Sequence, residues 1–498
     1  MIGSSHDRSY FRSTIILLIF VLFFFLFKSV PQAFAADIDS SAVEQRIQRI
    51  QNGLAPFIVT NESYPKKSIT GRMAELGIPG VSIAVIHKGK IDWARGFGVM
   101  ERGGLPVTPD TLFQAASISK PVTAMAVLRM AESKKIDLDT DVNKYLKSWK
   151  VPSNSFTGQA DVTIRRLLSH TAGMTIHGFK GYEPGAAIPS LVQVLKGEKP
   201  ANTQPVTVDT VPGTIWRYSG GGYEVLQLAM QDITGKSFPE FMQEMVLAPF
   251  GMTHSTFEQP LPEYRQGEAA AAYRNHGQPV RGRALTHAEL AAAGLWTTPS
   301  DLAGFIINIQ ETLSGKSQKL ISRETAQMMT TPVLGNYGLG LQTGGSESKP
   351  YFGHGGSNVG FKCKMIAYKN GDGAVVMTNC DTGIVLIREI IRAVAVEYGW
   401  PDFQPRLIKE MTVSPDILKQ YAGTYKLAPN FDLNIICSNN QLMLNLPGQG
   451  YIPIFAESGT KFYSALMETE IEFIKDDKGS VTHLIYMQED NNIKAVRK

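Results

Sequence analysis

The order of apolar and polar positions along the chain predicts helices combined with antiparallel strands. Two strand-like segments, 81–86 and 91–98, flank Lys88-Gly89-Lys90, a pattern typical of a hairpin closed by a glycine turn. Before them, residues 40–51 have the spacing of a short amphipathic helix. Because a long helical pattern follows the hairpin, we expect helices packed on an antiparallel sheet, which is an α+β architecture.

The longest helical pattern in this region begins at a proline. Apolar residues recur at core-helix spacing over 122–131, and Pro121 fixes the start of that helix. Ser117 therefore lies at the opening turn, and because three residues are about one helical turn, Lys120 shares its face. A hydroxyl at a helix N-terminus, beside a lysine that can carry its proton away, is suited to nucleophilic catalysis.

The spacing of a serine and a lysine three residues apart is a weak signal by itself. It recurs at three other places, where the surroundings are polar and rich in turns or contain a proline between the two residues: Ser63/Lys66, Ser346/Lys349 and Ser458/Lys461. None of these pairs opens a buried helix. The context therefore favours Ser117.

Two glycine-rich segments follow. A helical stripe ends at Gly235 and leaves Tyr218-Ser219-Gly220 on the loop before it, where packing and functional roles for the tyrosine are equally good interpretations. Residues 351–368 indicate a turn that feeds a strand, and 374–378 a second strand of the same hairpin. His354 lies among the glycines of that turn, and taken alone it is expected to be a turn histidine with satisfied hydrogen bonds.

Three further expectations concern the segments between these motifs. His170 ends a short helix, and a lone histidine there is expected to satisfy backbone groups and not to act as a base. Residues 178–210, rich in Gly, Pro and polar side chains, predict a long surface loop bordering the site. Ser300 is the expected N-cap of the next helix.

The C-terminal part has a different pattern. After a plausible linker at 401–415, eight short strands recur at regular spacing, which predicts a small antiparallel barrel or sandwich without a catalytic set. These strands are expected at 421–425, 433–437, 442–446, 451–455, 461–463, 471–475, 481–487 and 493–496.

The N-terminal segment predicts export. A continuous apolar run at 14–27 follows two arginines and precedes Ala33-Phe34-Ala35, which is typical of a secretory signal cleaved after Ala35. The alternative is an uncleaved anchor, the one route by which a membrane would be involved. We therefore expect a periplasmic or secreted protein.

Composition excludes several classes of function. The 498 residues include 49 basic and 45 acidic residues, without a basic stripe, so no nucleic-acid partner is indicated. The chain lacks G-x-S-x-G, which disfavours an α/β hydrolase, and its histidines lack metal-ligand spacing, so no metal or other cofactor is expected. Cys363 and Cys380 could pair across neighbouring strands, but buried free thiols are favoured.

Residues 79–379 resemble the serine β-lactamase-like family, which includes class C β-lactamases, D-Ala-D-Ala carboxypeptidases, D-aminopeptidases and esterases. Ser117-Ile118-Ser119-Lys120, Tyr218-Ser219-Gly220 and His354-Gly355-Gly356 occur in the family's order, supported by LLSHTAGM and PGTIWRYSGGGY. The resemblance implies an α-helical subdomain beside the sheet and a C-terminal lipocalin-like domain. The expected plan is a signal at 1–35, a catalytic domain at 36–400, the linker at 401–415 and the barrel at 416–498.

The resemblance also implies roles for individual residues. Ser117 would be the acylated nucleophile, with Lys120 and Tyr218 as its proton relay and the backbone N–H groups of Ser117 and Ser357 as the oxyanion hole. A lysine ammonium beside a phenol would lower the pKa of the phenol, and a desolvated lysine would release its own proton more easily.

Two departures from the family pattern bear on the substrate. Gly220 stands where β-lactamases usually have an asparagine, and His354 and Gly355 stand where they have lysine and threonine before the glycine, here Gly356. Because that amide and cation are absent, neutral esters or amides are more strongly expected as substrates than β-lactams. We expect an exported serine hydrolase acting on a small-molecule or peptide substrate, cell-wall peptides included. The rival is a penicillin-binding, cell-wall-peptide-recognising protein with little or no turnover.

Overall fold

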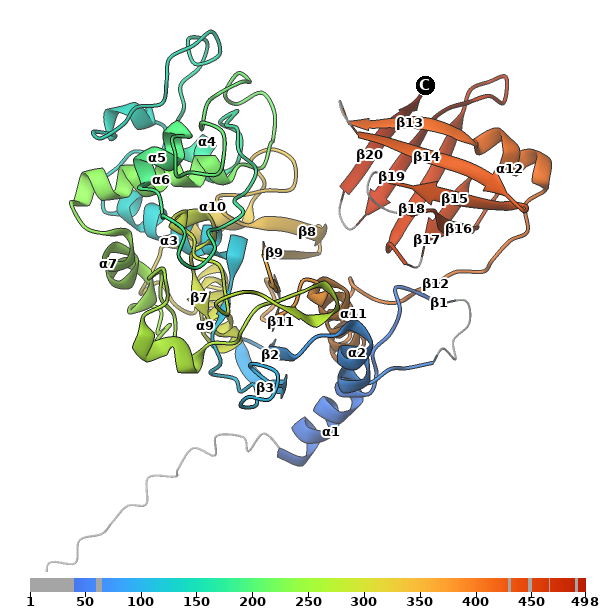
Figure 1. Cartoon of the computed structure of the whole chain (residues 1–498), viewed down its shortest axis with the longest axis horizontal. Helices are drawn as coiled ribbons and strands as arrows, with labels where there is room; N and C mark the ends of the chain where they lie inside the picture. The colour runs from blue at the N-terminus through green and yellow to red at the C-terminus, as the bar shows by residue number, and fades with distance from the viewer. Residues whose placement is uncertain (1–39, 60–64, 429–430, 447–449, 465, 489–490) are drawn as a thin grey trace, which may run out of the picture.

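The computed structural model of the chain describes residues 40–59, 65–428, 431–446, 450–464, 466–488 and 491–498. The expected signal segment, 1–35, lies outside the described residues. Figure 1 shows two bodies, a large mixed domain and a smaller barrel formed by the C-terminal strands. The α+β architecture followed by an antiparallel barrel is confirmed.

The large domain is built on a six-stranded antiparallel sheet with the order β3-β2-β11-β10-β9-β8. The predicted first hairpin is confirmed, because β2 (Gly80–His87) pairs with β3 (Lys90–Gly98) around Lys88 and Gly89. The other strands are β8 (Gln342–Ser346), β9 (Lys349–Asn358), β10 (Phe361–Tyr368) and β11 (Gly373–Thr378). The expected turn around His354 is wrong, since that residue lies inside β9 and pairs with Met365 of β10.

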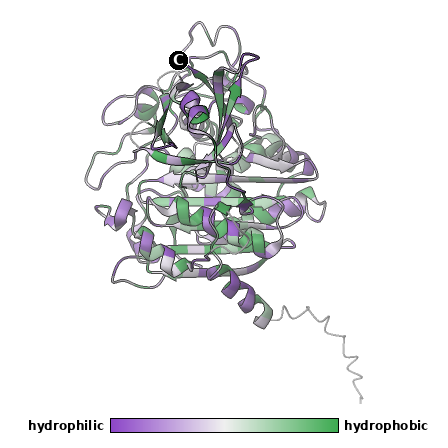
Figure 2. Ribbon diagram, turned by 90° about the vertical axis from the view of Figure 1, so that its right-hand side faces the viewer, coloured by the Kyte–Doolittle hydropathy of each residue, from purple (hydrophilic) through white to green (hydrophobic). Residues whose placement is uncertain are grey.

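Helices cover both faces of this sheet. One face packs against α1 (Ser40–Gln51), α2 (Ile69–Leu76) and α11 (Gly383–Tyr398). The other face packs against α9 (Pro299–Leu313) and continues into the helical subdomain. Figure 2 shows apolar segments along the sheet and the helices that cover it.

The helical subdomain surrounds one central helix, α3 (Ser119–Glu132), in which eleven residues are buried. Its other helices are α4 (Ile164–Leu168), α5 (Leu191–Lys196), α6 (Gly220–Thr234), α7 (Phe238–Met242), α8 (Leu290–Ala293) and α10 (Arg323–Thr330). Short paired segments join the subdomain to the sheet: β4 (Phe113–Gln114) with β7 (Trp296–Thr297), and β5 (Tyr273–Arg274) with β6 (Gln278–Pro279).

Two expectations about this region need correction. The segment 178–210 is not all loop, because Ser190 and Gln193 form a capping box that starts α5 and buries Val194. The N-cap of α9 is Thr298 and not Ser300, because Pro299 occupies the first helical turn and the Thr298 hydroxyl accepts the N–H of Asp301.

The C-terminal strands form a closed eight-stranded barrel, so the barrel alternative is correct. The strands are β13 (Gly423–Ala428), β14 (Phe431–Ser438), β15 (Gln441–Asn445), β16 (Ile452–Ala456), β17 (Lys461–Ser464), β18 (Thr469–Lys475), β19 (Val481–Gln488) and β20 (Asn491–Arg497), preceded by α12 (Pro415–Tyr421). Closure leaves the sheet without a free edge.

Specific contacts fix the barrel to the large domain. The segment 401–415 contains β12 (Arg406–Leu407), which pairs in parallel with β1 (Ile58–Val59) near the start of the chain. Arg392 of α11 is buried and donates to Glu468 of the barrel at 2.7 Å and to the Ala55 carbonyl at 2.8 Å. The predicted linker is therefore partly ordered by pairing.

Two further features bear on the sequence interpretation. Cys363 and Cys380 are both free and buried, as favoured. Within the part of the chain that the structure describes, no helix has the length and apolar character needed to span a bilayer.

Candidate active site

Ser117 lies in a tight turn between β4 and α3. The 3-10 segment Ala116–Ile118 leads directly into α3, so Ser117 is at the opening turn, as predicted. Ala116 has a φ of 48°, a left-handed conformation that L-residues other than glycine, asparagine and aspartate rarely adopt. The turn is held from both sides, because the Ser119 hydroxyl donates to the Ala116 carbonyl at 2.6 Å and accepts the N–H of Leu295 at 3.0 Å. Ser117 remains partly exposed while its neighbours are buried.

Lys120 is buried directly beside the serine. Its Nζ lies 3.1 Å from Ser117 Oγ and 2.9 Å from the carbonyl oxygen of Ala292 in α8. Burial disfavours the ammonium form and lowers the pKa of Lys120 to about 7, partly opposed by the charge of Glu224. The expected desolvated lysine is confirmed by this geometry.

Tyr218 completes the cluster from the start of α6. Ser219 caps that helix by accepting the N–H of Gly222 at 3.0 Å, so Tyr218 lies directly before the N-terminus of the helix. The ring of Tyr218 lies 4.9 Å from Lys120 Nζ and 4.3 Å from the His170 ring, measured between centroids in the second case. The three predicted motif residues Ser117, Lys120 and Tyr218 thus meet in one place.

The expected effect on the phenol is wrong. Burial raises the pKa of Tyr218 above its ordinary value, and only the neighbouring Ser117 hydroxyl lowers it in part. Among the described residues, the buried Tyr218 hydroxyl makes no hydrogen bond of good geometry. The lysine does not reverse this effect, because it faces the ring and is itself easily deprotonated. Tyr218 is therefore a neutral phenol at neutral pH.

Strand β9 approaches the serine turn because it carries glycine. A Cβ on Gly356 would collide with the carbonyl oxygen of Ala115 and the sulfur of Cys363, whose thiol donates to that same carbonyl at 3.0 Å. The next residue, Ser357, is exposed at this edge, and its pairing partner in β10 is Lys362. The backbone of β9 is thus held against the segment that carries Ser117.

His354 provides no positive charge. Its Nδ1 is 2.6 Å from the Gly355 carbonyl, its Nε2 is 3.0 Å from the Tyr337 hydroxyl, and burial lowers its pKa to about 3. The satisfied hydrogen bonds were expected. Gly220 has no side chain, and a Cβ there would meet the ring of Phe179. The positions that hold a cation and an amide in β-lactamases therefore carry a neutral imidazole and no side chain.

Several further residues of this cluster lie outside the three motifs. Tyr337 is fully buried and holds His354, and Tyr223 is fully buried with its hydroxyl on the Leu168 carbonyl at 3.1 Å. His170 accepts the N–H of Ser219 at 3.1 Å through Nδ1, which confirms its backbone role and shows that it supports the Tyr218 segment. Glu224 of α6 is fully buried, and its charge among apolar residues was the signal in the sequence.

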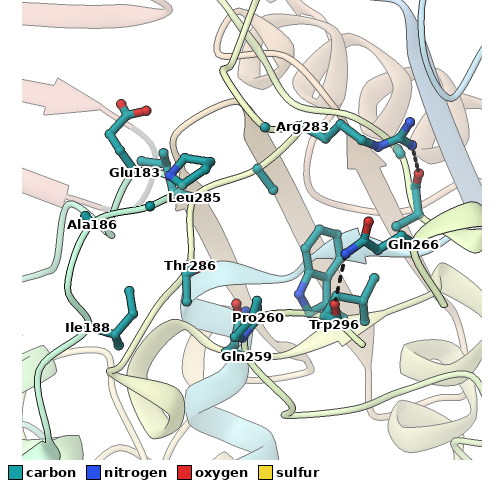
Figure 3. Close-up of a pocket in the computed structure, with 17 residues that line it drawn as sticks. Glu183, Ala186, Ile188, Gln259, Pro260, Gln266, Arg283, Leu285, Thr286 and Trp296 are labelled. Carbon is teal, nitrogen blue, oxygen red and sulfur yellow. Dashed lines mark hydrogen bonds between the residues drawn. The ribbon is translucent and has the colours of Figure 1, made fainter. Parts of the chain in front are cut away.

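A pocket of about 350 Å³ lies beside β4, and none of Ser117, Lys120 and Tyr218 lines it. Figure 3 shows its lining, which is largely apolar and includes Ile188, Pro260, Leu285 and Trp296. Two of these residues contact β4, because Gln114 donates to the Leu285 carbonyl at 2.8 Å and pairs with Trp296. No group of three or more His, Cys, Asp or Glu side chains suited to a metal occurs among the described residues.

Comparisons with known proteins show the family to which the chain belongs. The β-lactamase family matches residues 66–397, and a domain of unknown function, DUF3471, matches residues 408–495. The chain belongs to the β-lactamase family. This membership places it among the hydrolases of that family, and the barrel is the distinct second domain.

Individual relatives are distant. Protein flp of Staphylococcus aureus (strain N315) is 27% identical over 252 residues, which cover 49% of this chain and 46% of flp, so the match spans about half of that relative. Penicillin-binding protein 4* of Bacillus subtilis (strain 168) is 23% identical over 415 residues, 79% of this chain and 89% of the relative.

A solved structure shows the same fold. The octameric penicillin-binding protein homologue from Pyrococcus abyssi superposes with a TM-score of 0.59 at 19% identity, covering 92% of this chain and 100% of that one. At this identity the likeness concerns the arrangement of the chain alone.

Proposed function

We propose that this β-lactamase-family protein is an exported serine hydrolase that forms a covalent acyl-enzyme on ester or amide substrates. The observation that carries the proposal is the distance of 3.1 Å between Lys120 Nζ and Ser117 Oγ, with the lysine buried and its pKa lowered to about 7. An amine that is partly unprotonated near neutrality can accept the proton of the serine hydroxyl.

The reaction then follows from the positions of the groups. Ser117 Oγ attacks the substrate carbonyl carbon while its proton passes to the Lys120 amine. The oxyanion that forms is directed to the backbone N–H groups of Ser117 and Ser357. Tyr218, a neutral phenol, gives its proton to the leaving oxygen or nitrogen and regains one from Lys120. Water then attacks the acyl-serine by the same proton path in reverse.

The neutral surroundings favour neutral substrates. His354 carries no charge at neutral pH, and Gly220 offers no amide, so a substrate carboxylate finds neither of the partners expected in β-lactamases. Trp216, two residues before Tyr218, is 38% exposed and packs 6.0 Å from the Tyr337 ring between centroids. Uncharged esters with an apolar group are therefore the favoured substrate class.

A second candidate is penicillin or cell-wall-peptide binding with little turnover. It is favoured by the likeness to a relative named a penicillin-binding protein. The two functions differ in whether the acyl-enzyme is hydrolysed. The same serine would be modified in both.

Labelling tests the proposal directly. The intact protein and its Ser117→Ala variant are treated with a fluorophosphonate and with fluorescent penicillin, and the modified peptide is mapped by mass spectrometry. We expect the fluorophosphonate on Ser117 and on no residue of the variant. A folded protein that neither reagent modifies would exclude covalent catalysis.

Turnover then distinguishes the two candidates. p-Nitrophenyl esters, nitrocefin and a D-Ala-D-Ala peptide are compared under the same conditions. We expect the esters to be hydrolysed fastest. Stable penicillin labelling without turnover of any of the three would support the binding function, and fast nitrocefin hydrolysis would show that the absent cation is dispensable.

Export is part of the proposal and is tested separately. The apolar run at 14–27 and the small residues at 33–35 support a cleaved signal. N-terminal sequencing of protein recovered outside the cytoplasm should begin at Ala36. A sequence that begins at Met1 would favour the uncleaved anchor.

A further inference from the structure

Two carboxyl side chains are fully buried behind Lys120, and the reaction described above does not use them. Glu224 of α6 and Glu289, the residue before α8, each have a relative exposure of 0%. In each, the Oε2 atom has no hydrogen-bond partner among the described residues. Burying an incompletely paired carboxyl is unfavourable. The presence of such a group beside a reactive lysine therefore indicates a functional role.

One residue, Ala292, joins Glu224 to Lys120. The Ala292 carbonyl accepts from Lys120 Nζ at 2.9 Å, and the Ala292 N–H donates to Glu224 Oε1 at 3.0 Å. The lysine and the carboxyl therefore bind the two polar groups of a single residue. Their charges interact directly as well, since each shifts the pKa of the other toward its ionised form.

We propose that Glu224 is a positioning residue for Lys120, whose carboxylate charge sets how readily the lysine amine holds the proton of Ser117, and that Glu289 moderates this charge. The inference rests on the proposed function, because it assumes that Lys120 is the base. It assigns a role to a residue outside the three family motifs.

Glu289 is placed to act on Glu224. Its Oε1 accepts from the Tyr182 hydroxyl at 2.9 Å, and its Oε2 lies 3.9 Å from His287 Nδ1. Burial raises the pKa of Glu289 to about 7, while His287 is held neutral because burial lowers its pKa to about 4. Burial raises the pKa of Glu224 well above its ordinary value, and the charge of Glu289 raises it further, so the two carboxyls resist ionising together.

The other titratable groups around the pair carry no charge near neutrality. They face Lys120 from the segment after α4, from the start of α6 and from β9, and all of them are shifted toward their neutral forms: His170, His177, Tyr218, Tyr223 and His354. When it is ionised, Glu224 is the carboxylate whose charge reaches the lysine.

The two carboxyls predict opposite effects on the lysine. Without the charge of Glu224, Lys120 loses the partner that stabilises its ammonium. Its pKa then falls, and the ammonium loses its proton at lower pH. Without the charge of Glu289, Glu224 ionises more easily, and Lys120 then keeps its proton to higher pH. A role limited to packing would not produce shifts of opposite sign.

The test measures the rate of Ser117 modification by a fluorophosphonate against pH, from below to above neutrality, in the full-length protein. In the pH profile of this rate, we expect the acidic limb to move about one pH unit lower in Glu224→Gln. In Glu289→Gln, we expect it to move to higher pH. Gln227→Leu is the matched control, because Gln227 accepts the N–H of Ala291 at 2.8 Å from the same helix without any charge. Its limb should stay in place.

The outcomes separate the two proposals. If both carboxamide variants move the limb in one direction, or neither moves it while wild-type Ser117 is modified, the inference is overturned and the proposed function stands. If folded wild-type protein is not modified at all, both are overturned. Should Glu224→Gln not fold, Glu289→Gln decides alone, because it leaves the contacts of Lys120 and Glu224 with Ala292 intact.

Discussion

Lys120 Nζ lies 4.9 Å from the centre of the Tyr218 ring, so the amine faces the flat side of the phenol. Lys120 and the hydroxyl of Tyr218 are buried, and burial moves both groups toward their neutral forms: it lowers the pKa of Lys120 to about 7 and raises that of Tyr218. The lysine is therefore the group that accepts a proton, and the tyrosine is a group that gives one.

This division of roles predicts how Tyr218→Phe behaves. Losing a general acid lowers rates by about a hundredfold or more, but only where the leaving group needs a proton. We expect a large loss for alkyl esters or amides and a small one for p-nitrophenyl esters, whose leaving group departs as an anion. Comparison of kcat/KM for the two ester types measures this, and equal losses would assign Tyr218 to the attack step instead.

Lys120→Met should stabilise the protein while abolishing modification of Ser117. The pKa of Lys120 is about 7 when folded and 10.5 in its reference state, so between these values the unfolded chain binds the extra proton. The free energy of unfolding of the wild type consequently rises with pH across this window. Below pH 7 the native state bears the full cost of burying the Lys120 ammonium.

The gain from Lys120→Met should accordingly be on the order of a few kcal/mol at or below neutrality and shrink toward pH 10. Denaturant unfolding of both proteins at several pH values measures the difference, in which the titration of other groups cancels. A gain that does not change with pH would contradict the lowered pKa.

Gly356→Ala should separate β9 from the serine turn. Its Cβ would meet the Ala115 carbonyl and the Cys363 sulfur, both in the buried interior, so we expect a loss of about 1–3 kcal/mol and slower modification of Ser117. Gly355→Ala is the matched comparison for stability, because its nearest contact, the Lys364 side chain, is at 3.7 Å. Thermal unfolding should show a clear drop for the first variant only.

Glu468 of the barrel forms an ion pair with Arg392 of α11. Removing its charge by Glu468→Gln leaves Arg392, 4% exposed, with a weakened partner, and we expect a loss of about 2 kcal/mol together with faster proteolysis within 401–415. Asp432→Asn serves as the control, because its 2.6 Å ion pair with Lys498 is exposed and should contribute under about 1 kcal/mol. Equal proteolysis of the two variants would mean that the ion pair does not hold the barrel.

Where neighbouring residues decide a structure, the sequence predicted it well. The first hairpin, a helix that begins within two residues of Pro121 and the eight strands of the barrel follow from short-range periodicity and turn residues. The errors arise where a distant partner decides. Glycines around His354 indicate a turn in isolation, but pairing with β10 extends them as a strand. The six residues of α5 are too few to give a helical periodicity that can be recognised within the polar loop around them.

The sequence by itself identified the Ser117, Tyr218 and His354 motifs, because each is a short stretch of neighbouring residues and the three occur in the family's order. Only the tertiary structure decided the charge that each of them bears. The environment that neutralises Lys120, Tyr218 and His354 is assembled from segments far apart in the chain, and so is the contact of the buried Glu224 with Ala292. Desolvation depends on everything that surrounds a group, and spacing along the chain does not encode it.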